Sequence, residues 1–536
     1  MGKSIYDQFK HAANAYPNNT AAVFEGHKWT FKELDREIDT ASRKLVTLGV
    51  KEKDVVAVAM PNCPEALFLF YAISKIGAIS YNIHPLTPAS LMAVHIKKSG
   101  ARILICLANA CYDHRMVLPD SVTIVSVNPY WRINLIKALV LFHISKRAHG
   151  IKGYAGIHPA KSSPTVHPDP DDDAVYLNTG GTNGEPKIVR LSSRSINNLA
   201  LKGYPLFGGR LKDIKMLTAI PLFHGFGLAM GVHTPISWGA STVLVLKFNT
   251  REAIRYIRKG EATVIIGVPA LYNALLSRES FYGPWLKKQI VAFIGGDSVP
   301  ESLLDQWNTT MSRFLSSARL FEGYGLTETV NVTNVNTYGR AKRGTIGKPL
   351  PNLREIIVDP ETGVPLPTGK SGEICIGGDC LMNGYLNDEE LTQKSFLTIE
   401  GRRYFRTRDF GYIDEDGYLT FRQRLRRIVK INGETVCPSD VEDVALSLFD
   451  VYEAYCFPVE DKRKGHVLCL AVVQREGPKG HVKEEAIEQE IYAAVQKNLP
   501  PQYKPATIIF LEHLPRTPVG KIDAAEFEKI KGKIRL

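Results

Sequence analysis

Apolar runs alternate with amphipathic segments along the N-terminal half of the chain. Leu34, Ile38 and Leu45 recur at helical spacing behind Thr30, a suitable N-cap, which predicts a helix over residues 30–50. A second helix is expected over 66–76. Buried strands are predicted at 55–60, 79–83, 101–106, 242–246, 263–266 and 290–294. Strands that alternate with helices are typical of a parallel, doubly wound α/β sheet.

The pattern changes over residues 340–425. Glycine and proline become dense there, and short apolar runs at 373–376 and 418–421 stand beside turn sequences such as 414–417. This composition predicts an antiparallel β region. A basic cluster follows at 422–427, and we place a domain boundary there because the strand–helix alternation then restarts and continues toward residue 536.

Composition excludes a disordered or fibrous chain. The 536 residues are 44% hydrophobic and 23% charged, which is an ordinary globular balance. The net charge of +12 favours anionic partners, such as nucleotides, nucleic acid, phosphorylated cofactors or a lipid surface. Lysine and arginine are dispersed and no nucleic-acid-binding motif is present, so we expect no nucleic-acid partner.

The cysteines and the N-terminus indicate a cytoplasmic protein. None of the 8 cysteines forms a C-x-x-C pair, which is typical of reduced, buried thiols. The first residues are polar and lack the apolar core of a secretory signal. No run reaches the ~20 apolar residues of a transmembrane helix.

Residues 131–148 carry four basic side chains and no acidic one among many apolar residues, including Trp131 and Phe142. One interpretation is an interfacial helix that makes peripheral contact with a membrane. The other is a surface helix packed on the core, with its lysine and arginine stems lying along apolar surface. The sequence slightly favours the second.

The sharpest local motif is Thr179-Gly-Gly-Thr-Asn-Gly-Glu-Pro-Lys187, which follows an apolar run at 174–177. Its glycines, hydroxyls and exposed amides suit a polyphosphate, and Lys187 adds a positive charge. The Walker A pattern requires Gly-Lys-Ser/Thr at a helix start, whereas Glu185 and Pro186 intervene here. The motif therefore predicts a phosphate loop of another kind, or else an ordinary surface turn.

Two further motifs carry acidic residues. In Glu322-Gly-Tyr-Gly-Leu-Thr-Glu328 the glycines would admit a flat ligand, and Thr327 and Glu328 offer the hard oxygen ligands that Mg²⁺ prefers. Asp409, in Phe405-Arg-Thr-Arg-Asp-Phe-Gly411, would accept bonds from ribose hydroxyls or simply cap a turn.

Two basic motifs stand nearer the C-terminus. One runs from Arg424 to Lys430 and continues into Asn432-Gly-Glu434. The other, Pro515-Arg-Thr-Pro-Val-Gly-Lys521, places a lysine on a glycine- and proline-rich loop.

The order and spacing of these five motifs resemble the adenylate-forming (AMP-binding) superfamily, which includes acyl-CoA synthetases. The resemblance covers nearly the whole chain. Further matching segments are Met60-Pro-Asn-Cys-Pro-Glu65, Gly77-Ala-Ile-Ser-Tyr-Asn-Ile-His-Pro85, Pro221-Leu-Phe-His-Gly225, Gly344-Thr-Ile-Gly-Lys-Pro349 and Gly372-Glu-Ile-Cys-Ile376.

The resemblance implies an α/β fold of two parts. Residues 1–424 would form a large domain of two doubly wound α/β subdomains and a β-barrel-like subdomain, and 425–536 a small, mobile α+β domain. It also implies a two-step reaction. A carboxylate attacks the α-phosphate of ATP to give an acyl-adenylate and pyrophosphate, and a thiol, usually coenzyme A, then takes the acyl group.

The resemblance also assigns roles in the first step. The phosphates of ATP would be held by Thr179, Gly180, Gly181, Thr182, Asn183, Gly184 and Lys187. Tyr324, with Gly323 and Gly325 beside it, would lie near adenine, while Asp409 and Arg424 would fix the ribose. Thr327 would touch the α-phosphate, Glu328 would bind Mg²⁺, and Lys521 would neutralise charge as it builds on the α-phosphate and carboxylate.

The second step would follow a rotation of the small domain about Arg426. Lys430 and Gly433 would then face the thioester chemistry. His224 matches a family position beside the substrate carboxylate, with a satisfied core histidine as the alternative. Tyr385, in Asn383-Gly-Tyr-Leu386, follows the family pattern and is assigned only a structural role.

The resemblance narrows the function to an acid–thiol ligase, and the acid is expected to be a fatty or other apolar one. The expected pocket segments at 204–233, 265–272 and 295–297 are largely apolar, and no aspartate stands at 223–226 to bind a substrate ammonium. The alternatives are an aryl-acid CoA ligase and a fatty acyl-AMP ligase that loads an acyl carrier protein. A catalytically silent member is disfavoured by the presence of Glu328, Asp409, Arg424 and Lys521.

Overall fold

The computed structural model describes residues 3–130, 134–144, 150–179, 187–207, 213–296, 299–330, 332–431, 434–461, 465–475, 483–516 and 522–531. Contacts divide the chain into two units. The large unit comprises residues 1–356, 375–407 and 416–419, and the small unit comprises 357–374, 408–415 and 420–536. The boundary predicted between residues 424 and 425 stays a prediction.

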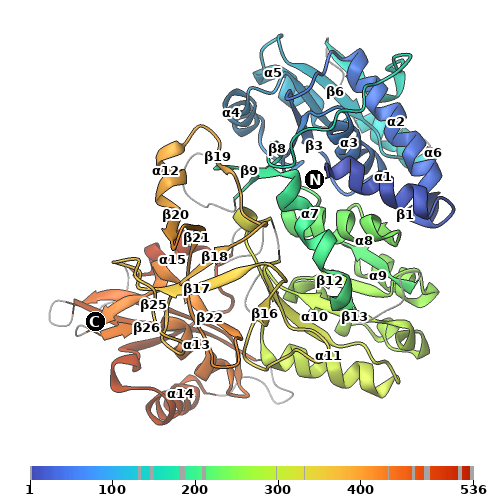
Figure 1. Cartoon of the computed structure of the whole chain (residues 1–536). Coiled ribbons are helices and arrows are strands. Elements are labelled where there is room, and N and C mark those ends of the chain that lie inside the picture. Colours follow the sequence, from blue (N-terminus) through green and yellow to red (C-terminus); the bar gives the residue numbers. More distant parts are fainter. Residues whose placement is uncertain are drawn as a thin grey trace. The chain divides into compact units, whose positions relative to one another are not determined.

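Two mixed sheets form the framework of the large unit (Figure 1). The eight-stranded sheet has the order β19-β9-β8-β4-β3-β5-β6-β7, and the nine-stranded sheet has the order β16-β15-β14-β13-β12-β10-β11-β1-β2. Strands of the first are β3 (Val55–Ala59), β4 (Ile79–Asn82), β5 (Ile103–Leu107), β6 (Thr123–Val127), β7 (Ile151–Gly153), β8 (Asp173–Asn178), β9 (Ile188–Ser192) and β19 (Gly384–Tyr385). Those of the second are β1 (Thr20–Phe24), β2 (His27–Thr30), β10 (Lys215–Thr218), β11 (Ser241–Leu244), β12 (Val264–Gly267), β13 (Val291–Ile294), β14 (Leu320–Tyr324), β15 (Asn334–Val335) and β16 (Lys348–Pro349).

The central strands of both sheets pair in parallel, and antiparallel strands are added at the edges. This confirms the doubly wound α/β prediction, and the ends of each predicted strand lie within two residues of those observed. The predicted helix over 30–50 is α2 (Phe31–Thr47), where Thr30 and Glu33 form a reciprocal capping box.

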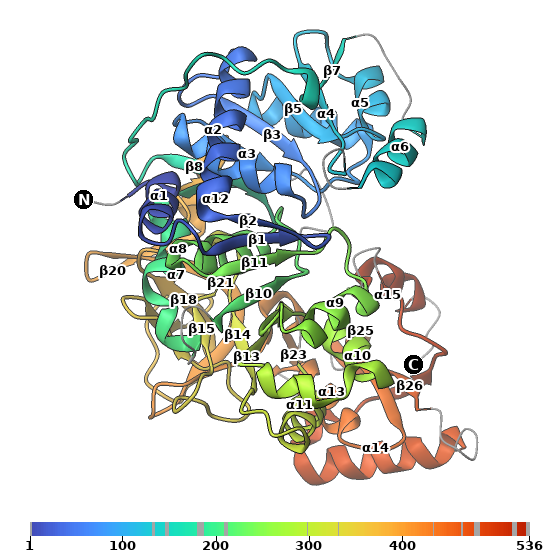
Figure 2. The same ribbon diagram turned by 90° about the vertical axis from the view of Figure 1, so that its right-hand side faces the viewer.

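Helices cover the outer face of each sheet and fill the space between the two (Figure 2). Between the sheets lie α1 (Ile5–Ala15), α2, α3 (Pro64–Lys75), α7 (Ser193–Lys202) and α8 (Thr234–Trp238). Outside the eight-stranded sheet lie α4 (Ala89–Ser99) and α5 (Cys111–Val117), and outside the nine-stranded sheet lie α9 (Thr250–Lys259), α10 (Pro269–Leu276) and α11 (Glu301–Arg313). Apolar residues on almost every side of α3 are buried, because the helix packs between two sheets.

The chain crosses between the units within strands of a further sheet. Its order is β17-β18-β21-β20, with β22 paired to β21. The strands are β17 (Arg354–Val358), β18 (Gly372–Gly377), β20 (Phe396–Ile399), β21 (Arg402–Ile413) and β22 (Leu419–Arg424), and α12 (Glu389–Lys394) precedes β20. The β-rich region predicted over 340–425 is thus confirmed, including a turn before β22 with Gly417 at φ 77°.

The small unit has an α+β core of its own. Its three-stranded sheet runs β25 (Val451–Asp461), β26 (Gly465–Gln474) and β27 (Thr507–Phe510), and a hairpin joins β23 (Val429–Ile431) to β24 (Glu434–Val436). Helices α13 (Pro438–Leu446) and α14 (Glu484–Asn498) pack on one face of the sheet. Helix α15 (Ala524–Lys531) packs on the other, where Phe527 is buried against Phe457.

Candidate active site

The predicted motifs of the large unit lie at or shortly after the C-terminal ends of strands. Thr179 comes after β8, the segment of His224 after β10, Gly295 after β13 and Gly325 after β14. In open α/β sheets, ligands bind at the carboxyl ends of strands, where the connecting loops and backbone amides are free to face them. The fold therefore supplies a structural reason for the placement of these motifs.

The Thr327–Glu328 motif lies in a short 3-10 turn, Thr327–Thr329. Two hydrogen bonds from one neighbouring segment hold Glu328. The Met382 amide donates to the Glu328 carbonyl oxygen over 2.9 Å, and the Tyr385 hydroxyl donates to the Glu328 carboxylate Oε1 over 2.9 Å. The acidic side chain is therefore held in one orientation and not left to sample solvent.

Glu328 suits Mg²⁺ in the manner of nucleotide-dependent enzymes. Such sites use one or two carboxylates together with substrate phosphates and water, and not a closed cage of protein ligands. Among the residues the structure describes, no group of three or more histidine, cysteine, aspartate or glutamate side chains could hold a metal ion. The one carboxylate that Tyr385 orients, Glu328, suits a site of this kind, in which phosphates and water would supply the remaining ligands.

The predicted phosphate loop is the connection of a β-hairpin. Strands β8 and β9 pair antiparallel, and the Thr179 amide donates to the Lys187 carbonyl at the base of the loop. The Lys187 ammonium lies 5.8 Å from the centroid of the Tyr385 ring, which is within cation–π range. The predicted phosphate contacts Gly180, Gly181, Thr182, Asn183 and Gly184 lie outside the described residues.

His224 is exposed, so the alternative of a satisfied core histidine is wrong. It stands just before the π-helical segment Phe226–His233, and its carbonyl oxygen accepts a bond from the Leu228 amide. The next residue packs so closely on the 327–330 turn that a Cβ on Gly225 would stand 1.7 Å from the Val330 carbonyl oxygen. Glycine at 225 therefore lets this segment approach Val330, the residue that ends the Thr327–Thr329 turn.

Sequence reasoning missed two residues that shape the segment of His224. Asn62 is buried and makes three hydrogen bonds to backbone at 218–222, two from its amide nitrogen and one to its carbonyl oxygen. The His84 ring lies 4.6 Å from the Phe223 ring, and burial lowers the pKa of His84. Asn62 and His84 both lie in segments that match the family, 60–65 and 77–85. Nothing in the local pattern of these segments shows that they contact residues some 140 to 160 positions away.

The glycine-rich motif at 323–325 approaches the strand beside it. A Cβ on Gly295 would lie 2.7 Å from the Gly323 carbonyl oxygen, so only glycine allows this contact. Tyr324 ends β14, and its carbonyl oxygen accepts a bond from the Thr333 amide. Burial, with repulsion from Glu301, raises the pKa of Glu322 to about 7.

In the small unit, the two predicted ribose-binding residues meet. The Arg424 Nη1 lies 3.0 Å from the Asp409 Oδ1, and the Asp409 side chain is fully buried. Asp409 lies within the long strand β21, so the alternative role of capping a turn is wrong. The pairing fixes the Asp409 carboxylate and leaves about half of the Arg424 side chain exposed.

Lys430 is the exposed residue of β23, between the buried Val429 and Ile431. It pairs with Thr435 across β23 and β24, and its ammonium lies 2.8 Å from the Glu361 carboxylate, with both side chains largely exposed. The predicted hinge residue Arg426 lies in a 3-10 turn, Leu425–Arg427, and its side chain lies outside the described part of the structure. Gly433 lies outside it as well.

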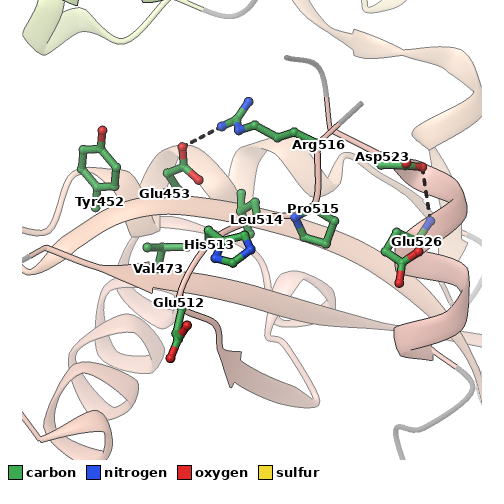
Figure 3. A pocket seen from close by; sticks show the side chains of 10 residues that line it. All are labelled: Tyr452, Glu453, Val473, Glu512, His513, Leu514, Pro515, Arg516, Asp523 and Glu526. Carbon is green, nitrogen blue, oxygen red and sulfur yellow. Dashed lines mark hydrogen bonds and ion pairs between the residues drawn. The ribbon is translucent and has the colours of Figure 1, made fainter. Parts of the chain in front are cut away.

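Lys521 lies outside the described residues, but the segments on either side of its loop are placed. Arg516 and Ile522 form an antiparallel bridge. Beside it is a hollow in the small unit lined by Glu453, Glu512, Arg516 and neighbouring residues, shown in Figure 3. The Arg516 guanidinium pairs there with the Glu453 carboxylate over 2.6 Å. The hollow contains none of the predicted site residues.

Helix α6 (Leu135–Ile144) falls within the basic segment predicted over 131–148. It packs through the buried Ala138, and Lys137 pairs with Glu25 over 2.7 Å. Ile136, Leu139 and Val140 are exposed. Within the described part of the chain, no helix has both the length and the hydropathy needed to span a bilayer.

Comparisons with known proteins agree with this fold. The family profile described as "AMP-binding enzyme" matches residues 9–386, and the profile described as "AMP-binding enzyme C-terminal domain" matches 440–521. The first match covers well over half of the chain, so the chain belongs to the AMP-binding enzyme family.

Similar curated proteins are CoA ligases. A 4-coumarate–CoA ligase 2 of Solanum tuberosum is 29% identical over 91% of this chain and 86% of its own. A long-chain-fatty-acid–CoA ligase of Bacillus subtilis is 27% identical over 97% of this chain and 93% of its own. ATP-bound MatB from Rhodopseudomonas palustris, 23% identical, has the same fold with a TM-score of 0.86 and full coverage of both chains. The predicted enzyme class, an AMP-forming acid–thiol ligase, is confirmed, whereas the relatives differ in the acid that they take.

Proposed function

We propose that this enzyme activates a fatty or other apolar carboxylic acid with ATP and transfers the acyl group to coenzyme A. The observation that carries the proposal is the meeting of three motifs in the large unit. The 327–330 turn contacts the segment of His224 through Gly225, and it shares Tyr385 with Lys187 at the end of the phosphate loop. Groups suited to a carboxylate, a metal and a polyphosphate are thus gathered around one turn.

In the first step, a carboxylate oxygen of the acid attacks the α-phosphorus of ATP, and the bond to the β-phosphate breaks to release pyrophosphate. Lys187 and the amides of its loop would neutralise the phosphates, and Thr327 would contact the α-phosphate. Bound Mg²⁺, held by Glu328, would screen the charge of the phosphates. Lys521 would stabilise the charge that develops on the α-phosphate and the carboxylate.

In the second step, the sulfur of coenzyme A attacks the acyl carbonyl carbon, and the bond to AMP breaks. Lys430 and Gly433 would act here. The ion pair between Lys430 and Glu361 is exposed, so water screens it and Lys430 can exchange partners at little cost. Asp409 and Arg424 would hold the ribose throughout. Rotation about Arg426 would exchange Lys521 for the loop of Lys430.

The apolar acid is supported by the segment that follows His224. Leu228, Ala229, Met230 and Val232 are fully or almost fully buried, and no charged side chain stands among them. The curated relatives take acids as different as 4-coumarate and long-chain fatty acids, as their names state. An aryl acid is therefore the alternative substrate class, and an acyl carrier protein is the alternative acceptor.

One assay separates these alternatives. Pyrophosphate release is measured for aliphatic acids of increasing length and for benzoic and cinnamic acids, with coenzyme A, with an acyl carrier protein, or with no acceptor. We expect release with aliphatic acids, accelerated by coenzyme A. Preference for the aryl acids, or acceleration by the carrier protein alone, would overturn the corresponding part of the proposal.

Helix α6 supports a peripheral membrane contact. Its exposed Ile136 and Val140 stand on a segment with four basic residues and no acidic one, a combination that favours an anionic lipid surface. The double variant Ile136→Ser, Val140→Ser would lower co-sedimentation with anionic vesicles, while vesicles of zwitterionic lipid serve as the control. Equal sedimentation of the variant and the native enzyme would contradict the contact.

A further inference from the structure

The segment 382–386 holds two parts of the proposed site at once. Its strand β19 pairs with β9, with Tyr385 opposite Val189, only two residues after Lys187. The Asn383 amide donates to the Arg190 carbonyl and the Leu386 amide to the Ile188 carbonyl, which fixes the segment on the strand that leaves the phosphate loop. On its other side, the Met382 amide holds the Glu328 carbonyl.

Tyr385 itself is held firmly. Its side chain is 7% exposed, and its amide donates to the Thr392 hydroxyl over 2.9 Å. Gly384 precedes it with φ 153°, and a Cβ there would stand 2.7 Å from the Thr392 side chain. Backbone and neighbouring helix therefore leave the tyrosine little freedom, and both its ring and its hydroxyl have fixed directions.

From this arrangement we propose that Tyr385 is a positioning residue of the adenylation step, an inference that rests on the proposed function. Its hydroxyl orients the Glu328 carboxylate over 2.9 Å, and its ring supports the Lys187 ammonium at 5.8 Å. One side chain thus sets the direction of the proposed metal ligand and the place of the cation for the phosphates. A carboxylate that accepts one bond at Oε1 keeps further lone pairs for a metal ion.

Two substitutions distinguish the effect of the Tyr385 hydroxyl from that of its ring. Tyr385→Phe removes the hydroxyl but keeps the ring, whereas Tyr385→Leu removes both. The matched control is Tyr6→Phe, because the Tyr6 hydroxyl also donates to a carboxylate, that of Asp35, in another part of the large unit. A hydrogen bond to a charged group is typically worth about a ten- to hundredfold change in an equilibrium or rate.

The first readout is binding, not turnover. ATP is titrated by calorimetry at rising Mn²⁺, and bound Mn²⁺ is followed by electron paramagnetic resonance. In Tyr385→Phe we expect about tenfold more Mn²⁺ to be needed for the same ATP affinity, with affinity for ATP in the absence of metal unchanged. Tyr385→Leu should also weaken metal-free ATP binding, because Lys187 loses its support. Tyr6→Phe should match the native enzyme in both measurements.

The second readout is a double-variant cycle with Glu328→Gln on acid-dependent pyrophosphate release. If Tyr385 acts through Glu328, the loss caused by Tyr385→Phe largely disappears in the Glu328→Gln background. Native metal dependence in Tyr385→Phe, or additive losses in the cycle, would overturn the inference. Absence of acid-dependent pyrophosphate release from the native enzyme would instead overturn the proposed function.

Discussion

The two units hold their candidate residues in different ways. In the large unit, Glu328 is fixed by a backbone amide and a buried tyrosine, and glycine at 225 brings a neighbouring segment into van der Waals contact. In the small unit, the exposed Lys430 side chain pairs with an exposed carboxylate. Groups that bind polyphosphate gain from being oriented before the ligand arrives, whereas a group that serves only one half-reaction must be released easily.

The Asp409–Arg424 pair is an intermediate case. The carboxylate is fully buried and the guanidinium is about half exposed, so one partner is rigid while the other can adjust to a ligand. A ribose that stays bound through both half-reactions would require this combination. The comparison therefore predicts three kinds of response to substitution: slower adenylation, weaker ATP binding in both steps, and slower thioester formation.

The largest effect is expected for Lys521→Ala. Loss of the cation that neutralises charge in the transition state should slow acyl-adenylate formation by about a hundred- to a thousandfold, with ATP affinity nearly unchanged. Acid-dependent pyrophosphate release and ATP calorimetry measure the two quantities. Lys529→Ala, which removes an exposed lysine paired with Glu526 in the same unit, is the control. Native rates of release in Lys521→Ala would disprove the assignment.

Asp409→Asn should weaken ATP binding by about ten- to a hundredfold, because a charged acceptor of ribose hydroxyl bonds is lost and Arg424 loses its partner. The effect should be similar on both half-reactions. The control is Asp440→Asn, since Asp440 also pairs with an arginine, Arg422, in the small unit. If both variants changed the KM for ATP equally, the ribose role would be wrong.

Lys430→Ala should slow thioester formation by about tenfold and leave adenylation unchanged. Separate rapid-mixing measurements of the two half-reactions test this. Glu361→Gln releases Lys430 from its ion pair and should not slow either step. Equal losses in both half-reactions of Lys430→Ala would contradict the division of labour between the units.

A smaller effect is expected on the pH dependence of the free energy of unfolding, through Glu322. Burial raises the pKa of Glu322 to about 7, so the folded chain holds a proton that the unfolded chain releases near pH 4.5. Binding of this proton stabilises the folded state at low pH, and this stabilisation is lost as the pH rises through 7. Relative to Glu322→Gln, the native enzyme should lose on the order of 1 to 3 kcal/mol between pH 5 and 8 in denaturant unfolding. A constant difference across this range would show that Glu322 titrates normally.

Much of the fold followed from local pattern. The capping box at Thr30 and Glu33, the apolar strands and the glycine turn at 417 are all properties of short segments, and short-range physics decides them. The exact strand ends were shifted by a residue or more, because hydrogen bonding between strands determines where a strand begins and ends.

The site was less accessible to sequence reasoning. The motif order indicated the chemistry, but the contacts of Asn62 with residues at 218–222 and of Tyr385 with Glu328 join positions far apart in the chain. Local pattern carries no information on such contacts. Asp409 was expected before a turn and instead lies within β21, since pairing with neighbouring strands continues past the glycine at 411.

The most direct test of the central claim is a single-turnover experiment in two stages. The enzyme is first mixed with an aliphatic acid, ATP and Mg²⁺ without coenzyme A, and pyrophosphate and acyl-AMP are quantified after rapid quenching. Coenzyme A is then added. We expect close to one acyl-AMP and one pyrophosphate for each active site, followed by conversion of the acyl-AMP to thioester and AMP. Release of ADP and phosphate, or of pyrophosphate only after coenzyme A is added, would contradict the account.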